Sequence, residues 1–155
     1  MITMSFKFVF DAEKCCGCGA CVVACVDQND TDIQGGYPSL RRVWAEETEE
    51  DGYGSLHFFS EACHHCRDAP CMAKCPKQCI VRDEETGLVV CDPRMCVGCG
   101  ACLRACPYHI PYIDKQRKMH KCNGCTERIH AGLLPACVRI CPTKALTLVE
   151  ERMGP

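Results

Sequence analysis

Residues 96–107 read CVGCGACLRACP, and this stretch decides the fold of the protein. Two residues separate the first cysteine from the second and the second from the third, three residues separate the third from the fourth, and a proline ends the run. This spacing is typical of cysteines that bind iron–sulfur clusters. Cys96, Cys99 and Cys102 are expected to lie on one tight loop around a single cubane. Cys106 follows Cys102 by four residues on a short helix, a rise of about 6 Å, so its thiolate reaches a second cluster. One motif therefore predicts two clusters.

The motif is repeated along the chain. An offset of 81 residues (96 − 15) aligns it with the first group of cysteines, together with two glycines and two alanines. Two further groups have the same character but longer gaps. The three other groups are Cys15, Cys18, Cys21 and Cys25; Cys63, Cys66, Cys71 and Cys75; and Cys122, Cys125, Cys137 and Cys141. Sixteen of the 19 cysteines thus fall into four groups of four, and three groups end in Cys-Pro.

Three cysteines lie outside these groups and are predicted not to be ligands. Cys16 aligns with Val97 in the repeat and is expected to be a small apolar loop residue. Cys79 follows a Cys-Pro pair at the same spacing as Ala145, and Cys91 ends an apolar run, so both are expected to be small buried residues.

Length and charge limit the class of protein. A chain of 155 residues with 19 cysteines has a thin hydrophobic core, so metal coordination is expected to supply much of its folding free energy. The formal net charge is −2, and four cubanes with four thiolates each would bring it to about −10. A surface of that charge excludes nucleic acid as a partner.

The sequence contains no candidate membrane span, since no run approaches about 18 apolar residues. The first ten residues, MITMSFKFVF, have neither a secretory pattern nor a twin arginine. The expected compartment is the cytoplasm. The alternative is export of a folded complex by the twin-arginine signal of a partner.

Short strands and turns are expected between the cysteine groups. A strand should end at Phe10, and a hairpin over about residues 39–60 should consist of two strand-like runs separated by an acidic loop from Glu46 to Gly54. The runs at residues 79–82 and 88–91 predict a second hairpin. TERIHAG predicts a helical turn closed by Gly132, Pro135 should start the helix that carries Cys137 and Cys141, and residues 145–149 predict a last strand.

Other interpretations of the cysteines fit the spacing less well than iron–sulfur ligation. Four zinc sites would also use sixteen thiolates, but zinc ribbons pair two distant CxxC knuckles, whereas two groups here carry three cysteines in succession. Nothing indicates a secreted disulfide framework. His64 and His65 suggest Rieske-like ligation, but loop roles are favoured because cysteines fill every ligand position.

Trp44 is expected to pack against neighbours, with electron relay or partner contact as the alternative.

The whole set of motifs, from Cys15 to Pro142, resembles the four-cluster ferredoxin-type electron-transfer beta subunits of the dimethyl sulfoxide reductase family, which accompany molybdenum or tungsten pterin enzymes. The resemblance implies an α+β fold in which one polyferredoxin domain, residues 1–155, contains two pseudo-symmetric bacterial-ferredoxin-like units. Ferredoxin unit A would comprise residues 15–25 and 122–142, and ferredoxin unit B residues 63–106, with the hairpin as an insertion.

The resemblance also implies the ligands of four 4Fe-4S clusters. Cluster 1 would be bound by Cys15, Cys18, Cys21 and Cys141; cluster 2 by Cys25, Cys122, Cys125 and Cys137; cluster 3 by Cys63, Cys66, Cys71 and Cys106; and cluster 4 by Cys75, Cys96, Cys99 and Cys102. Each short helix that ends a motif would then carry ligands of two neighbouring clusters.

The implied function is electron transfer without a catalytic site, since the sequence has no pterin, flavin or nicotinamide motif. The first hypothesis is a subunit that relays single electrons to or from a molybdenum- or tungsten-pterin catalytic subunit. The second is the equivalent subunit of a hydrogenase or formate-hydrogen-lyase assembly, or a stand-alone polyferredoxin. The third is a conducting filament formed by self-association. A flavoprotein or a membrane anchor is an alternative further partner.

Overall fold

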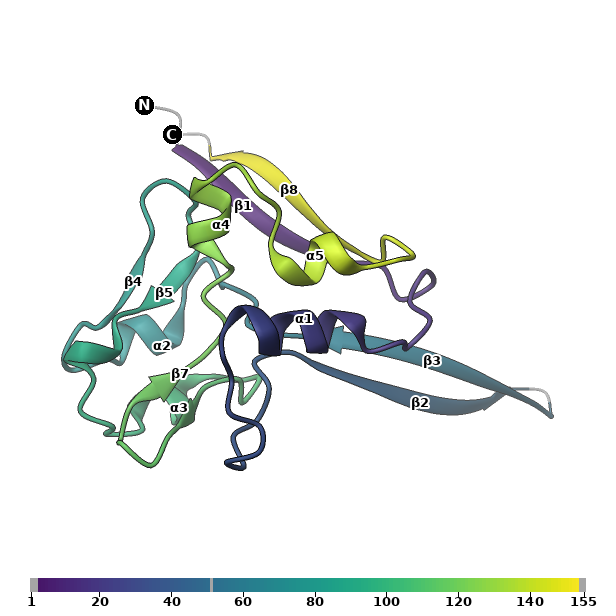
Figure 1. Ribbon diagram of the computed structural model, residues 1–155, viewed down its shortest axis with the longest axis horizontal. Coiled ribbons are helices and arrows are strands. Elements are labelled where there is room, and N and C mark those ends of the chain that lie inside the picture. Colours follow the sequence, from purple (N-terminus) through teal and green to yellow (C-terminus); the bar gives the residue numbers. More distant parts are fainter. Residues whose placement is uncertain (1–2, 51, 154–155) are drawn as a thin grey trace. The chain divides into compact units, whose positions relative to one another are not determined.

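A computed structural model describes residues 3–50 and 52–153 of the chain (Figure 1). The chain divides into two compact units. Unit 1 consists of Met1–Lys7, Cys63–Leu133 and Glu150–Pro155, and unit 2 consists of Phe8–Ala62 and Leu134–Val149. Helices and strands are short and mixed in both units, as expected for a ferredoxin-like α+β protein.

Unit 1 is built from very short elements around a small apolar core. In chain order they are α2 (Pro70–Ala73), β4 (Ile80–Arg82), β5 (Val89–Cys91), the 3-10 helix η1 (Pro93–Met95), α3 (Ala101–Ala105), β6 (Tyr112–Ile113), β7 (Met119–His120) and α4 (Thr126–His130). Ile80, Val89 and Met119 are buried together with Cys96 and Cys102. Helices of four or five residues are not stable alone, so packing and ligands must hold them.

The β4–β5 hairpin confirms the strand pair predicted for residues 79–91. Its register pairs Ile80 with Cys91 and Arg82 with Val89. The turn is closed by Asp83, whose carboxylate accepts hydrogen bonds from the Thr86 backbone N–H (2.8 Å) and hydroxyl (2.6 Å). These bonds satisfy groups that the short ladder leaves unpaired.

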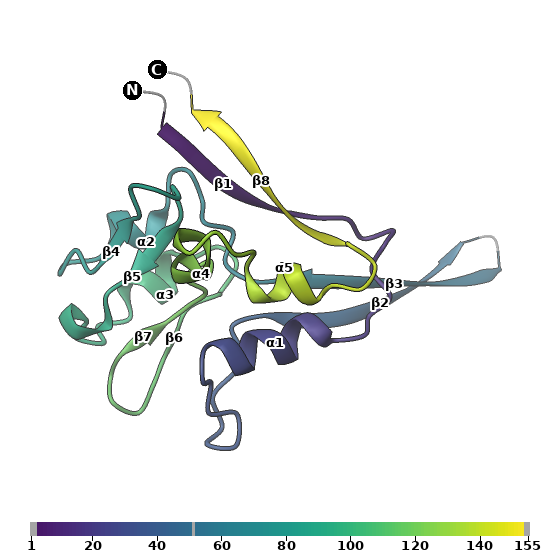
Figure 2. The same cartoon turned by 45° about the horizontal axis from the view of Figure 1, so that its top comes forward.

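Unit 2 contains α1 (Ala20–Gln28), α5 (Ala136–Ile140) and the hairpin of β2 (Arg42–Glu50) and β3 (Tyr53–Glu61). Helices α1 and α5 lie side by side (Figures 1 and 2); α1 carries the buried Cys21 and Cys25, and α5 carries the buried Cys137. Pro135 is the N-cap of α5, so the predicted start of this helix is confirmed. The helix ends at Ile140, however, and Cys141 is its C-cap in an extended conformation rather than a helical residue as predicted.

Strands β1 (Thr3–Phe10) and β8 (Leu146–Met153) form a two-stranded sheet (Figure 2). The prediction of a strand ending at Phe10 is confirmed. The last strand begins close to the predicted residue but continues to Met153, four residues beyond the predicted Val149 (153 − 149).

The predicted acidic loop between the hairpin strands is wrong. Glu46, Glu47 and Glu49 belong to β2 and pair across the ladder with His57, Leu56 and Gly54. Antiparallel pairing satisfies their backbone groups, and none of the three stands opposite another acidic residue. All three side chains are exposed, whereas Asp51 lies outside the described residues.

Helix α4 ends as the sequence predicts. Gly132 has φ 73°, the Gly132 N–H donates to the Ile129 carbonyl (2.9 Å) and the Leu133 N–H donates to the Arg128 carbonyl (2.8 Å). This pair of bonds is a Schellman motif, which requires a left-handed residue where glycine costs least. Among the described residues no helix has the length and apolar character needed to cross a membrane.

Candidate iron–sulfur sites

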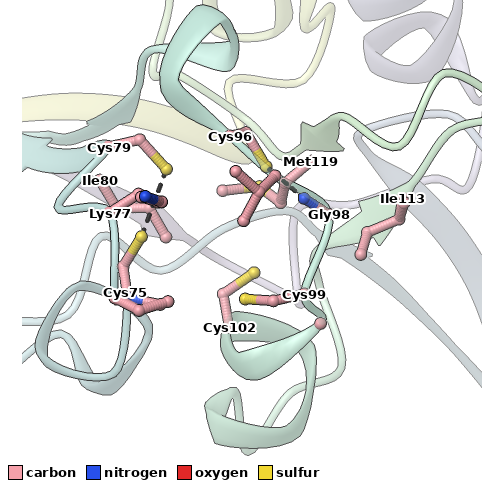
Figure 3. Close-up of a pocket in the computed structure, with 13 residues that line it drawn as sticks. Cys75, Lys77, Cys79, Ile80, Cys96, Gly98, Cys99, Cys102, Ile113 and Met119 are labelled. Carbon is pink, nitrogen blue, oxygen red and sulfur yellow. Dashed lines mark hydrogen bonds between the residues drawn. The ribbon is translucent and has the colours of Figure 1, made fainter.

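The first cavity, site 4, lies in unit 1 and is lined by cysteines of two motifs (Figure 3). Cys96, Cys99 and Cys102 come from the third motif, and Cys75 is the last cysteine of the second. The cavity holds about 330 Å³ of empty space, a figure that includes space open to solvent, and its other lining residues include Cys79, Ile80 and Met119. The four motif cysteines are those that the resemblance assigns to cluster 4.

The second cavity, site 3, repeats this arrangement in unit 1 with the motifs exchanged. Cys63, Cys66 and Cys71 come from the second motif, and Cys106 is the last cysteine of the third. The empty space between the lining residues is about 370 Å³, a figure that includes space open to solvent. Helix α3 thus carries Cys102 at site 4 and is followed directly by Cys106 at site 3. Helix α3 and its C-cap residue therefore contribute one cysteine to the lining of each cavity.

The third cavity, site 1, lies in unit 2 and holds about 320 Å³ of empty space, a figure that includes space open to solvent. Its cysteines include Cys15, Cys18 and Cys21 from the loop before α1 and from α1 itself, and Cys141 from the end of α5. Three cysteines of one motif and one of another again surround a single space.

The four residues assigned to cluster 2 are divided between the units. Cys25 and Cys137 are buried on α1 and α5 in unit 2. Cys122 and Cys125 belong to unit 1, where the Gly124 N–H donates to the Cys122 sulfur (3.3 Å) and the Asn123 side chain accepts from the Cys125 N–H (2.9 Å). The ligand set of cluster 2 stays a prediction.

All four motif loops share one backbone conformation. The residue two positions after the first cysteine has a positive φ in each: Gly17 (69°), His65 (48°), Gly98 (64°) and Gly124 (71°). The conformation turns the backbone N–H toward the preceding sulfur, and Gly98 donates to Cys96 at 3.4 Å while His65 donates to Cys63 at 3.5 Å. A Cβ at Gly98 would lie 2.5 Å from the Arg117 carbonyl oxygen, so glycine is required there.

The donor set and the cavities fit 4Fe-4S clusters. Sites 1, 3 and 4 each present cysteine sulfurs around an apolar space large enough for a group of several atoms, with backbone N–H groups directed at sulfur in sites 3 and 4. Among the described residues no three His, Cys, Asp or Glu side chains converge as ligands of a single metal ion. When bound, each cluster supplies one-electron redox chemistry, and the protein supplies thiolates, hydrogen bonds and exclusion of water.

Burial affects the thiols before iron binds. It raises the pKa of Cys66, Cys71 and Cys102 above the usual value for cysteine. At Cys75 and Cys141 burial acts in the same direction, but side-chain and backbone hydrogen bonds outweigh it and lower the pKa. Iron binding requires deprotonation in every case, so cluster insertion must release protons.

Two lysines bring positive charge to the sites of unit 1. Lys121 is 6% exposed, and its ammonium group donates to the Cys63 sulfur (3.6 Å) and to the carbonyl oxygens of Val89 and Cys122. The Lys118 ammonium group donates to the Cys96 carbonyl oxygen (2.8 Å) rather than to sulfur. Lys121 therefore has the geometry to neutralise part of the charge of a cluster at site 3.

Sequence reasoning missed a buried arginine at site 1. Arg41 is 4% exposed and its guanidinium group donates to the Ser60 hydroxyl (2.9 Å), which lies 3.4 Å from the Cys21 sulfur. No local pattern marks Arg41, because its contact comes from a strand 19 residues away.

The residues predicted not to bind iron differ in their exposure to solvent and in their contacts. Cys16 is exposed, Cys79 is buried and Cys91 is half-buried. His65 hydrogen-bonds to the Val89 backbone through Nδ1 (3.1 Å), and the His64 ring stacks on Tyr108 with centroids 3.9 Å apart.

Trp44 makes several contacts on the hairpin. It stacks on Phe59 at 5.4 Å and lies under the Arg42 guanidinium at 5.6 Å. Its indole N–H donates to Glu46 at 2.9 Å, in keeping with the predicted packing role.

The fold and the cysteine-lined cavities define an iron–sulfur protein of the ferredoxin type. Residues 55–151, more than half of the sequence, match the family described as 4Fe-4S dicluster domain, and the protein is a member of this family. Membership of this family identifies its clusters as 4Fe-4S clusters.

Several curated proteins are similar to most of the chain. The thiosulfate reductase electron transfer subunit PhsB of Salmonella typhi is 38% identical over 148 residues, covering 94% of this chain and 76% of PhsB. An anaerobic dimethyl sulfoxide reductase polypeptide of Haemophilus influenzae is 33% identical, covering 91% of this chain and 72% of its own length. This chain is 36% identical to the ferredoxin-like protein YdhX of Escherichia coli and spans 65% of the length of YdhX. The resemblance drawn from the motifs is confirmed.

Proposed function

We propose that the protein relays single electrons through four 4Fe-4S clusters to or from a molybdenum- or tungsten-pterin catalytic subunit. The observation that carries the proposal is the exchange of cysteines in unit 1, where each of two motifs gives three thiols to one cavity and its last thiol to the other. Such an exchange places two clusters beside one another across helices of four or five residues.

The same rule supports the proposed number of four clusters. Sites 1, 3 and 4 use twelve of the sixteen motif cysteines, and the remaining four are those assigned to cluster 2. The offset of 81 residues between the first and third motifs supports an arrangement of two pseudo-symmetric ferredoxin-like units.

The relatives support the partner class. PhsB is an electron transfer subunit of thiosulfate reductase, and the Haemophilus protein is one polypeptide of a dimethyl sulfoxide reductase. A reductase catalytic subunit is the partner that this similarity favours over a hydrogenase. The buried cations near site 3 and site 1 would favour the reduced, more negative clusters there and so make the potentials unequal.

Iron analysis tests the number of clusters. Anaerobically purified protein should contain about sixteen irons and as many acid-labile sulfides per polypeptide, with stepwise reduction in a potentiometric EPR titration. Zinc in place of iron, or half that iron content, would contradict the relay.

Purification of the native complex tests the partner. A large subunit containing molybdenum or tungsten should accompany the protein, and the clusters should be reduced or oxidised by that subunit's substrate. A nickel-containing partner would contradict the proposed partner while leaving electron transfer intact.

A further inference from the structure

Site 4 contains a fifth cysteine that the predicted ligand set does not use. Cys79 is 4% exposed and lines the same cavity as Cys75, Cys96, Cys99 and Cys102. Its sulfur lies 3.3 Å from the Cys75 sulfur (Figure 3). In the close-up these two sulfurs approach one another on the side of the cavity opposite the three cysteines of the third motif.

The position of Cys79 is fixed by a turn that occurs three times in the chain. After each Cys-Pro pair, the third residue beyond the cysteine has a positive φ: Gln78 (50°), His109 (52°) and Lys144 (58°). In each turn that residue's N–H donates to the carbonyl oxygen of the cysteine, at 3.2, 3.2 and 3.4 Å. The backbone geometry that follows the last ligand is therefore the same at sites 4, 3 and 1.

The fourth residue beyond the cysteine lines the cavity in all three cases. It is Cys79 at site 4, Ile110 at site 3 and Ala145 at site 1. The turn thus directs one side chain into each cluster cavity beside the last ligand, and two of the three sites have a hydrocarbon group there. Among these three described turns, only the one at site 4 has a side chain that can bind iron at the fourth position.

Resting on the proposed cluster at site 4, we propose that Cys79 is a reserve ligand of that cluster. While Cys75 binds iron, the Cys79 thiol donates its hydrogen bond to the Cys75 thiolate. When residue 75 offers no thiolate, Cys79 gives its proton to water and its thiolate forms the Fe–S bond that Cys75 otherwise forms. No electron is transferred in this exchange, and the iron keeps four sulfur ligands.

Site 3 is the matched control. Cys106 holds the place of Cys75 there, and the side chain at the reserve position, Ile110, cannot bind iron. The described lining of site 3 includes only the four predicted cysteines. Site 1 has Cys16 as an additional cysteine, but that residue follows the first ligand rather than the last and is exposed.

The test compares cluster content in three variants of the full-length protein by iron analysis and EPR. Cys75→Ala should keep a four-iron cluster at site 4, whereas Cys75→Ala/Cys79→Ala should lose it or retain only three irons. Cys106→Ala should lose one iron at site 3. Equal behaviour of the single and double variants at site 4, whether both keep the cluster, lose it or fail to fold, would overturn the proposal.

Two further variants test the reserve position at both sites. Cys79→Ala should keep all the iron but show a lower reduction potential at site 4, because the cluster loses a hydrogen bond to a ligand sulfur. Ile110→Cys added to Cys106→Ala should restore the iron lost from site 3, and failure to restore it would count against the proposal. If the Cys106→Ala variant kept all its clusters intact, the assignment of Cys106 as a ligand of the site 3 cluster would be contradicted instead.

Discussion

Sites 3 and 4 lie in the same unit and have the same plan, yet a different group approaches a ligand sulfur in each. At site 3 the Lys121 ammonium group lies 3.6 Å from the Cys63 sulfur. At site 4 the neighbour of the Cys75 sulfur is the neutral thiol of Cys79, at 3.3 Å. The repeated motif sets where the ligands stand, whereas residues outside the motif set the charge around them. Two otherwise equivalent clusters should therefore differ in reduction potential.

The largest predicted difference between sites 3 and 4 concerns the loop residue two positions after the first cysteine. Site 3 tolerates a side chain there, His65, whereas a Cβ at Gly98 of site 4 would meet the Arg117 carbonyl oxygen. Gly98→Ala should cost at least about 3 kcal/mol, from left-handed backbone strain and overpacking. Its measured result should be loss of the site 4 EPR signal while the site 3 signal persists.

Gly100→Ala is the matched control for this loop. Gly100 has a similar φ of 74°, but the nearest atom to its added Cβ is the flexible end of Arg104 at 3.1 Å. The substitution should cost only the backbone strain, about 1 kcal/mol, and retain both clusters. Equal cluster loss in the two variants would show that the close approach to Arg117 has no role.

Removing the buried charge at site 3 should give the next largest effect. Lys121→Met should lower the reduction potential of the site 3 cluster by on the order of 100 mV, about 2 kcal/mol for one electron, since the ammonium group favours the more negative reduced state. A potentiometric EPR titration measures this shift. The site 4 potential should change much less.

Two lysine variants separate charge from packing. Lys121→Arg keeps the charge, so the reduction potential of the site 3 cluster should stay close to the wild-type value. Lys118→Met removes an ammonium group that contacts the Cys96 carbonyl oxygen, and it should shift the reduction potential of the site 4 cluster only slightly. A site 3 potential that falls equally with Lys121→Arg and Lys121→Met would mean that lysine packing, not charge, matters.

The β4–β5 hairpin is shared by both sites, because Ile80 lines site 4 and Val89 lines site 3. Asp83→Ala removes the acceptor that closes its turn and the contact with His130 (3.2 Å), and should destabilise the protein by about 2 kcal/mol at pH 7. Clusters at both sites should then be lost in parallel during anaerobic urea titration. Loss at one site alone would show that the hairpin does not couple them.

The pH dependence of this effect has a definite sign. Burial opposes ionisation of Asp83, but hydrogen bonds from Thr86 and His130 outweigh it and lower its pKa below 3.8. A depressed carboxyl pKa stabilises the folded state above the unfolded value, and this stabilisation is lost as the pH falls through the folded pKa. The difference in stability between wild type and Asp83→Ala should therefore narrow as the pH falls below about 4.

The aromatic stack beside site 3 should contribute least. Tyr108 stacks on His64 at 3.9 Å with an interplanar angle of 5°, and it is 39% exposed. Tyr108→Leu should reduce stability by at most about 1 kcal/mol and leave the potential of site 3 unchanged. Tyr112→Leu, which removes the Tyr112–His120 stack (5.1 Å), is the control. A large shift of the site 3 reduction potential in Tyr108→Leu would contradict this prediction and would mean that the Tyr108 ring influences that potential.

The sequence predicted the main elements better than their extents. Gly132 and Pro135 marked helix ends correctly because backbone conformation at these residues is a local property. The acidic composition of β2 favours a loop over a strand, and only the paired strand β3 reveals the ladder.

The cysteine spacing by itself determined the class of protein, the cofactor and the motifs, because iron–sulfur ligation depends on a few residues at fixed intervals along the chain. The tertiary structure alone decided which groups from distant parts of the chain approach those sulfurs. Lys121 reaches Cys63 across 58 positions and Arg41 approaches Cys21 through Ser60. Such contacts form only when distant segments pack together, so no local pattern records them, and they are the contacts that distinguish one cluster from the next.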